Sequence, residues 1–229
     1  IKDIKFIEKN FKNKLVLVEK PLFEKKYKLN LINNKYFIGY NMRHHPLIKF
    51  IKAKIKNKRI WSVQVICGSY LPDWRKNINY TNSYSSKKNG GGVLLDLSHE
   101  LDYVSWIFGK IKTNFSFNKK ISNLKINSND YLSLFGIIKN KLMVQINLNY
   151  FMRNSTRRMY IDGLNVSYDL DLIKNTINYY ENGKKYYKKL KNYDLNEMYI
   201  SQHKDIITGK NKFTCTYTEA ESIMTLIKD

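Results

Sequence analysis

The feature that most constrains the fold is a series of short strand-like runs between residues 112 and 190. Turn signals such as Asp162-Gly163 and Asn182-Gly183 separate these runs, and no helix-like segment intervenes. Consecutive runs must therefore pair through short connections, which predicts a meander-like, mainly antiparallel sheet. The runs are expected at 112–120, 130–138, 141–151, 156–162, 164–170, 174–180 and 185–190.

The first 58 residues have a different pattern, in which apolar runs alternate with helix-like segments at 1–11, 22–33 and 47–57. Leu15–Val18 is wholly apolar, as in a buried parallel strand, and a second such run covers Tyr36–Tyr40. This alternation is typical of the closing part of a doubly wound domain. We therefore expect an α+β chain, in which an α/β remnant precedes an α+β domain.

Three consecutive glycines, Gly90-Gly91-Gly92, lead into a segment predicted to be helical as far as about Phe108-Gly109. A glycine turn at a helix start exposes unpaired N–H groups. On one continuous helix, an apolar stripe would face away from Asp96, His99 and Tyr103. That polar side could present an acid–base pair to a cleft, but a solvated face of an ordinary helix explains the spacing equally well. The apolar stripe consists of Leu97, Leu101, Val104 and Phe108.

A long loop, residues 69–92, precedes this helix, and a loop of that length is usually functional. It carries Tyr70, Trp74, Arg75 and Tyr84. Aromatic faces suit a sugar or a nicotinamide ring, and a guanidinium suits a carboxylate or phosphate. We expect these four side chains to line the same cleft as Lys20 and His99.

Composition excludes several classes of protein. No apolar run is long enough to span a membrane, and a hydrophobic content of 43% argues against disorder. The net charge of +22 comes mainly from lysines scattered along the chain, so we do not expect nucleic-acid binding. Cys67 and Cys215 match no metal spacing and are expected to be reduced thiols of a cytoplasmic protein. His44 and His45 are expected in helix-start packing or at a substrate rim, and no metal site is predicted.

Three motifs occur in a fixed order along the chain. They are Val18-Glu19-Lys20-Pro21, then Gly39-Tyr40-Asn41-Met42-Arg43-His44-His45-Pro46, then Gly90-Gly91-Gly92 leading to Asp96, His99 and Asp102. Together they resemble the glucose–fructose oxidoreductase/inositol dehydrogenase (Gfo/Idh/MocA) family. The resemblance extends over essentially the whole chain, and the loop before the glycines is similar to a branch found beside surface-sugar biosynthesis genes. The family consists of NAD(P)-dependent enzymes that act mainly on sugars.

The resemblance implies a role for each matching residue. Lys20 would lie between the nicotinamide and the substrate hydroxyls, and His99 would accept the hydroxyl proton as hydride leaves the same carbon. Asp96 would orient that base or tune its charge. The catalytic set is thus Lys20, His99 and Asp96, the cofactor-binding set is Glu19, Lys20, Pro21, Trp74 and Arg75, and the substrate-binding set is Arg43, Tyr70, Tyr84, Asp96 and His99.

Two departures from the family pattern matter. The family's Asp-x-x-x-His is one residue shorter here, so either a local helix adjustment keeps Asp96 in the site or Glu100 or Asp102 contributes instead. No G-x-G-x-x-G occurs, so we expect an N-terminally truncated dehydrogenase. Residues 1–58 would be a remnant of the dinucleotide-binding domain. Residues 59–229 would be the substrate and oligomerisation domain, whose final helix returns toward the first.

Three functions remain open from the sequence. The first is an NAD- or NADP-dependent sugar dehydrogenase that forms a homo-oligomer through its antiparallel sheet. The second is a non-catalytic binding or assembly protein that retains the sheet. The third is a basic nucleic-acid-binding protein, which salt-dependent retention on DNA would reveal. Arg43 as a surface helix-start residue and Lys20 as a solvated strand-end lysine are the structural alternatives to their roles in the first function.

Overall fold

The computed structural model describes residues 1–23, 27–139 and 141–226, and the chain packs as two compact units. One unit combines Ile1–His45 with Asp194–Asp229, and the other is Pro46–Tyr193. Two sheets with helices give the chain the predicted α+β class. The predicted functional domains, 1–58 and 59–229, assign residues 46–58 and 194–229 differently from these packing units. The functional division at residue 58 stays a prediction.

The first unit is built on a three-stranded sheet with the order β1-β2-β11. The predicted apolar runs form β1 (Leu15–Val18) and β2 (Lys35–Ile38), which pair in parallel. β11 (Cys215–Thr216) pairs antiparallel to β2. The helices of this unit are α1 (Lys2–Asn10), the short 3₁₀ helix η1 (Asn41–His44), α5 (Asn196–Ile207) and α6 (Tyr217–Met224).

The helix expected over residues 22–33 is absent from the described part of that segment, residues 22, 23 and 27–33. The buried carboxylate of Glu8 on α1 explains why. It accepts hydrogen bonds from the backbone N–H groups of Ile32 and Asn33, both at 2.7 Å. Burial opposes the charge of Glu8, but these bonds outweigh it and lower its pKa. The backbone donors are thus spent on a side chain rather than on a helix.

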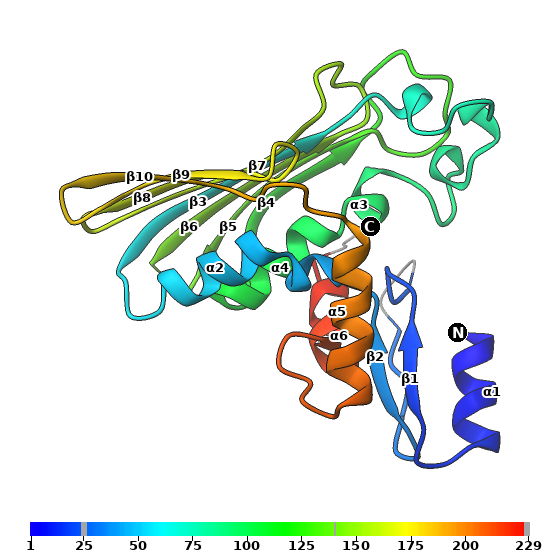
Figure 1. The fold of residues 1–229 in the computed structure, drawn as a ribbon. Helices are drawn as coiled ribbons and strands as arrows, with labels where there is room; N and C mark the ends of the chain where they lie inside the picture. The colour runs from blue at the N-terminus through cyan, green and yellow to red at the C-terminus, as the bar shows by residue number, and fades with distance from the viewer. Residues whose placement is uncertain (24–26, 140, 227–229) are drawn as a thin grey trace. The chain divides into compact units, whose positions relative to one another are not determined.

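The second unit is an eight-stranded sheet with the order β10-β9-β8-β7-β3-β6-β5-β4 (Figure 1). All neighbours are antiparallel except β3 and β6, which are parallel, so the predicted mainly antiparallel sheet is confirmed. The strands are β3 (Ile60–Gly68), β4 (Lys112–Lys119), β5 (Tyr131–Ile138), β6 (Leu142–Asn149), β7 (Thr156–Gly163), β8 (Val166–Asp171), β9 (Thr176–Glu181) and β10 (Lys184–Lys189).

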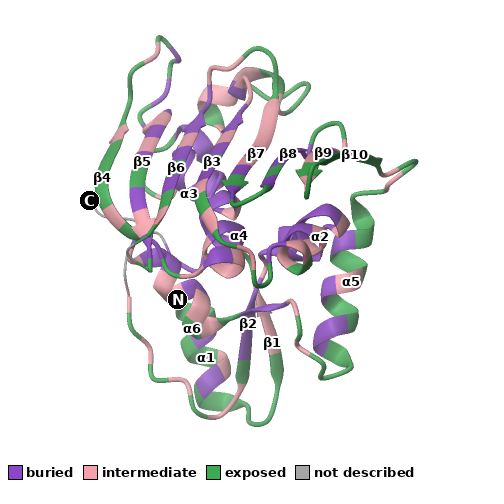
Figure 2. Ribbon diagram, turned by 90° about the vertical axis from the view of Figure 1, so that its left-hand side faces the viewer, coloured by how far each residue is buried: buried purple, intermediate pink, exposed green. Residues whose placement is uncertain are grey.

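One face of this sheet is covered by helices α2 (Pro46–Lys54), α3 (Val93–Asp96) and α4 (His99–Phe108). Buried and exposed residues alternate along β5 and β6, as period-2 patterning requires (Figure 2). Val63, Val65, Val144 and Ile146 are among the fully covered side chains. The other face leaves Phe115 and Phe135 well exposed, and its predicted role in oligomerisation stays a prediction. Among the described residues, no helix is both long and apolar enough to cross a membrane.

Candidate active site

The glycine turn is a close-packed structural element. A Cβ on Gly91 would lie 2.3 Å from the carbonyl oxygen of Tyr84, so only glycine fits there. Gly92 has φ +104, which glycine adopts without strain. Its N–H donates to the Ser85 carbonyl at 3.2 Å, and the N–H of Val93 donates to the Asn129 carbonyl at 2.9 Å. The expectation of unpaired N–H groups is therefore wrong for these two residues.

The helix after the glycines is interrupted between Asp96 and His99, whereas the sequence predicts one continuous helix. Leu97 takes φ −99 and ψ 28, and the hydroxyl of Ser98 donates to the Leu95 carbonyl at 2.9 Å. A serine hydroxyl that binds a nearby carbonyl competes with regular helix geometry. Asp96 thus ends α3 and His99 begins α4, so the shortened Asp–His spacing coincides with a local break in the helix.

The segment buries more than its apolar stripe. Leu97, Leu101, Val104 and Phe108 are all buried, as predicted. On the polar side, Asp96 is 7% exposed and Tyr103 is fully buried, so a solvated helix face does not describe them. His99 is half-buried at the first position of α4.

Asp96 is the centre of a polar and aromatic group that we call the Asp96 cluster, made of Trp74, Arg75, Tyr84, Asp96 and Tyr150. The Tyr150 hydroxyl donates to Oδ2 of Asp96 at 2.5 Å, and the Trp74 ring meets the Tyr150 ring edge-on at 5.2 Å. The Arg75 guanidinium lies over the Tyr84 ring, 5.2 Å from its centroid. Three of the four predicted loop residues therefore gather around Asp96.

The pKa values of two tyrosines are shifted by their burial and by their closeness to Asp96. Burial raises the pKa of Tyr150, and the Asp96 carboxylate raises it further. Burial likewise raises the pKa of Tyr84, with the charge of Asp96 as the next cause. Tyr150 therefore remains a neutral O–H donor to Asp96. Sequence reasoning missed Tyr150, which directly follows β6 and has no motif of its own; its only signal is that a buried tyrosine needs a partner.

Tyr70, the fourth loop residue, is engaged elsewhere. The guanidinium of Arg153 lies over its ring, 3.4 Å from the centroid. Next to it in the loop, the Trp74 indole N–H donates to the Ser69 hydroxyl at 2.7 Å. These contacts hold the start of the loop in place beside β6, where the Leu71 N–H donates to the Tyr150 carbonyl at 2.8 Å.

Glu100, the sequence alternative to Asp96, is part of a buried ion pair. Nε of Arg157 lies 2.7 Å from its Oε1, and the Glu100 side chain has no solvent exposure. Burial, followed by the charge of Glu100, raises the pKa of the nearby Cys67 thiol to about 12, which makes this cysteine inert. Asp102, the other alternative, is also fully buried. Glu100 is thus engaged by Arg157, and the role of Asp96 beside His99 stays a prediction.

In the first unit, two predicted motifs meet at one edge of the sheet. Because β1 and β2 are parallel, Glu19-Lys20-Pro21 and Gly39 follow their carboxyl ends side by side. The Lys20–Pro21 peptide bond is cis. A Cβ on Gly39 would lie 3.4 Å from both the Val18 carbonyl and Oε2 of Glu19, which shows how closely the two strand ends approach.

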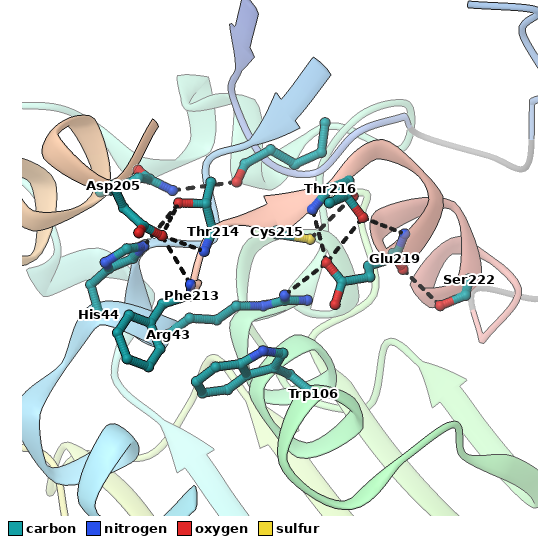
Figure 3. Close-up of polar contacts among 12 residues, drawn as sticks. Arg43, His44, Trp106, Asp205, Phe213, Thr214, Cys215, Thr216, Glu219 and Ser222 are labelled. Carbon is teal, nitrogen blue, oxygen red and sulfur yellow. Dashed lines mark hydrogen bonds and ion pairs between the residues drawn. The ribbon is translucent and has the colours of Figure 1, made fainter. Parts of the chain in front are cut away.

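The Arg43 and His44 side chains are tied into the helices of the first unit (Figure 3). Nη1 of Arg43 lies 3.0 Å from Oε2 of Glu219, and the Arg43 side chain is 2% exposed. Nδ1 of His44 is 3.1 Å from the Ser201 hydroxyl. Arg43 is therefore not a surface residue, and its role in substrate binding stays a prediction. In the described part of the chain, no group of three or more His, Cys, Asp or Glu side chains is arranged to hold a metal ion.

Lys20, in the first unit, and His99, in the second, belong to different units. That they act on one substrate stays a prediction, as do the cofactor and substrate contacts of Glu19, Pro21, Trp74, Arg75, Arg43, Tyr70 and Tyr84.

The sequence matches a family model described as the GFO/IDH/MocA C-terminal domain over residues 48–169, more than half of the chain. The chain belongs to this family. The match includes β3, the glycine turn, the Asp96 cluster and most of the large sheet. No curated protein matches the sequence.

Solved structures share the fold at low identity. The aldose-aldose oxidoreductase from Caulobacter crescentus, complexed with glycerol, has a TM-score of 0.79 at 12% identity. The match covers 99% of this chain and 71% of that protein. A levoglucosan dehydrogenase in complex with NADH has a TM-score of 0.74 at 13% identity, and the match covers 92% of this chain and 68% of that protein. An oxidoreductase from Agrobacterium radiobacter, in complex with NAD+, L-tartaric acid and magnesium, has a TM-score of 0.70 at 14% identity, with 85% covered. The chain spans 61% of the length of that last protein.

Proposed function

We propose that the chain acts as an NAD(P)-dependent oxidoreductase of a sugar or sugar derivative, in which hydride leaves a ring hydroxyl carbon. The observation that carries the proposal is the Asp96 cluster, which places a buried carboxylate among aromatic side chains three residues before His99. Aromatic faces beside a carboxylate suit a sugar ring. The NADH and NAD+ complexes of two structurally similar proteins support NAD, with NADP as the alternative.

The carboxyl edge of β1 and β2 fits the nicotinamide end of such a cofactor. Open α/β sheets bind ligands at this edge, where Glu19, Lys20, Pro21 and Gly39 lie together. When bound, the nicotinamide would supply the carbon that accepts hydride. Because the 229 residues contain no G-x-G-x-x-G, we assign the pyrophosphate contacts to no residue of this chain.

Each residue then has a defined task. Lys20 would donate hydrogen bonds to the substrate hydroxyl and hold it at the strand ends. His99 would accept the hydroxyl proton, since a neutral imidazole titrates near neutral pH. Asp96, fixed by the Tyr150 hydroxyl, would be a positioning residue that sets the orientation or charge of His99.

The test is nicotinamide reduction with a panel of aldoses and uronic acids, in the natural protein that contains these residues. Lys20→Ala and His99→Ala should each lower kcat by about 10²–10⁴-fold, the usual contribution of a positioned acid or base. The rising limb of the pH–kcat profile should follow a group near neutral pH and vanish in His99→Ala.

His203→Ala is the matched control, because His203 is exposed on α5 and should leave kcat unchanged. Near-normal turnover by His99→Ala would remove it from the role of base. Sugar binding without any nicotinamide reduction would favour the binding or assembly protein instead. The homo-oligomer and the cytoplasmic location belong to the same proposal and are checked by light scattering and by fractionation of the source cells.

A further inference from the structure

A basic groove lies within the second unit at the end of the large sheet where β5 passes into β6. It has a volume of about 560 Å³ and is bordered by the C-terminal parts of α2 and α4, the start of β3 and the β5–β6 turn. That volume is typical of sites for small organic ligands, which span roughly 300–1,000 Å³. α4 runs from His99 to Phe108, so the groove is about 14 Å from the candidate base along this helix.

The interior surface of the groove is apolar. Phe108 and Ile138 are 8% and 1% exposed, and Ile55 is also buried. Ile60, Ile107 and Leu142 complete this surface and are partly exposed. Side chains of this kind favour a ligand with an apolar body, because they remove its surface from water.

The rim of the groove is strongly basic. Of the thirteen described residues that line it, six are Lys or Arg and none is acidic. Two of these cations already have partners: Lys58 pairs with Glu181 at 2.7 Å, and Nζ of Lys52 donates to the Trp106 carbonyl at 2.6 Å. The other four make no ion pair with any residue that the structure describes, and they are exposed to solvent: Lys56, Arg59, Lys139 and Lys141.

We propose that this groove binds a small amphipathic anion, with an aromatic or alkyl body against the apolar surface and a carboxylate, sulfonate or phosphate at the basic rim. The four rim cations come from two walls of the groove, one formed by the segment from α2 to β3 and the other by the β5–β6 turn. An anionic group between them would complement the charge of both walls at once. A concave apolar floor is what separates this site from a flat basic surface that would attract any polyanion.

The inference is tested on the 229-residue chain with 8-anilinonaphthalene-1-sulfonate, an aromatic sulfonate whose fluorescence rises in apolar surroundings. Titration should show saturable binding. N-phenyl-1-naphthylamine, which has the same aromatic body without the sulfonate, should bind at least about tenfold more weakly. Lys139→Glu/Lys141→Glu and Lys56→Glu/Arg59→Glu, one variant for each wall, should each raise the dissociation constant of the sulfonate at least about tenfold.

Lys119→Glu/Lys120→Glu is the matched control, because it makes the same change in net charge. Lys119 pairs with Tyr131 at the opposite end of β5, about 23 Å from Ile138. This variant should leave the dissociation constant within about twofold of the parent value. Circular dichroism establishes that each variant is folded, and milder Lys→Gln variants replace any that is not. If both wall variants bind the sulfonate as the parent does, the probe is bound elsewhere, such as the exposed sheet face, and the inference is overturned.

Discussion

Two arginine–glutamate pairs, one in each unit, have similar geometry and opposite burial. In the first unit, Arg43 is 2% exposed and its partner Glu219 is 43% exposed, with 3.0 Å between Nη1 and Oε2. In the second unit, Arg157 is 23% exposed and its partner Glu100 has no exposure, with 2.7 Å between Nε and Oε1. In the first pair the cation is the buried member, and in the second pair it is the anion.

The difference indicates how much stability is lost when one charged side chain of each pair is replaced. A buried charge that loses its partner has an uncompensated desolvation cost, whereas an exposed charge is recovered by water. Asp96 lies between these cases, because it is buried but its observed partner is the neutral hydroxyl of Tyr150. The three carboxylates therefore predict three different losses of stability.

The largest effect is expected for Arg157→Met, which removes the guanidinium bonds from the fully buried carboxylate of Glu100. Breaking a buried pair from one side costs about 3–5 kcal/mol of unfolding free energy. Urea denaturation of the variant and the parent measures the loss.

Arg157→Met/Glu100→Leu is the matched control, because it removes both charges. An apolar replacement of a buried pair is close to neutral, so the double variant should be more stable than the single one. If the double variant is the less stable of the two, the buried carboxylate is not the source of the loss.

A smaller effect is expected for Tyr150→Phe, which removes only the hydroxyl that donates to Asp96. A hydrogen bond to a charged group contributes about 1.5–3 kcal/mol, so the unfolding free energy should fall by about 2 kcal/mol. Tyr168→Phe is the matched control, because its buried hydroxyl has no hydrogen-bond partner among the described residues. Equal losses in both variants would show that the bond to Asp96 adds nothing beyond the burial of a tyrosine hydroxyl.

Much of this architecture could be read from the sequence because it depends on local patterns. The runs between residues 112 and 190 became strands since their turn signals and alternation act over a few residues. The prediction of a helix at 22–33 was wrong because Glu8, far away in the sequence, accepts hydrogen bonds from the N–H groups of Ile32 and Asn33. The shortened Asp–His spacing left a local helix adjustment open as one alternative, but the break between α3 and α4 itself could not be located from periodicity because it coincides with the bond of one serine hydroxyl.

The candidate site was predictable to a similar degree. Trp74, Arg75, Tyr84 and Asp96 were found from motifs and loop length, and they do gather in one cluster. Tyr150 and Arg157 could not be found this way, since each meets its carboxylate across more than fifty residues of sequence. A pairing of that range depends on sheet topology, which periodicity does not encode.

The smallest effect is expected for the pair in the first unit, and it should depend on pH. Burial opposes the charge of Glu219, but Arg43 and hydrogen bonds from Thr216 outweigh it, so its pKa lies below the ordinary value. A carboxylate with a depressed pKa contributes stability that is fully present above the pKa of the unfolded chain. That contribution is lost as pH falls through the lower pKa of the folded state.

Because Glu219 is 43% exposed, solvent screening limits the charge contribution of its pair with Arg43 to about 1 kcal/mol or less. Glu219→Gln keeps a side-chain oxygen that can accept from the buried guanidinium of Arg43, so this variant removes the charge and not the acceptor. Glu219→Gln should therefore lower the unfolding free energy by this amount at neutral pH, and the gap to the parent should close as pH falls below the ordinary glutamate pKa of about 4.3. Added salt should shrink the gap at neutral pH. Glu197→Gln, at an exposed position of α5, should show no such gap. A difference between Glu219→Gln and the parent that persists unchanged at low pH would mean that the glutamate acts through its packing and its α6 capping bonds, and that the exposed member of this pair contributes no charge stabilisation.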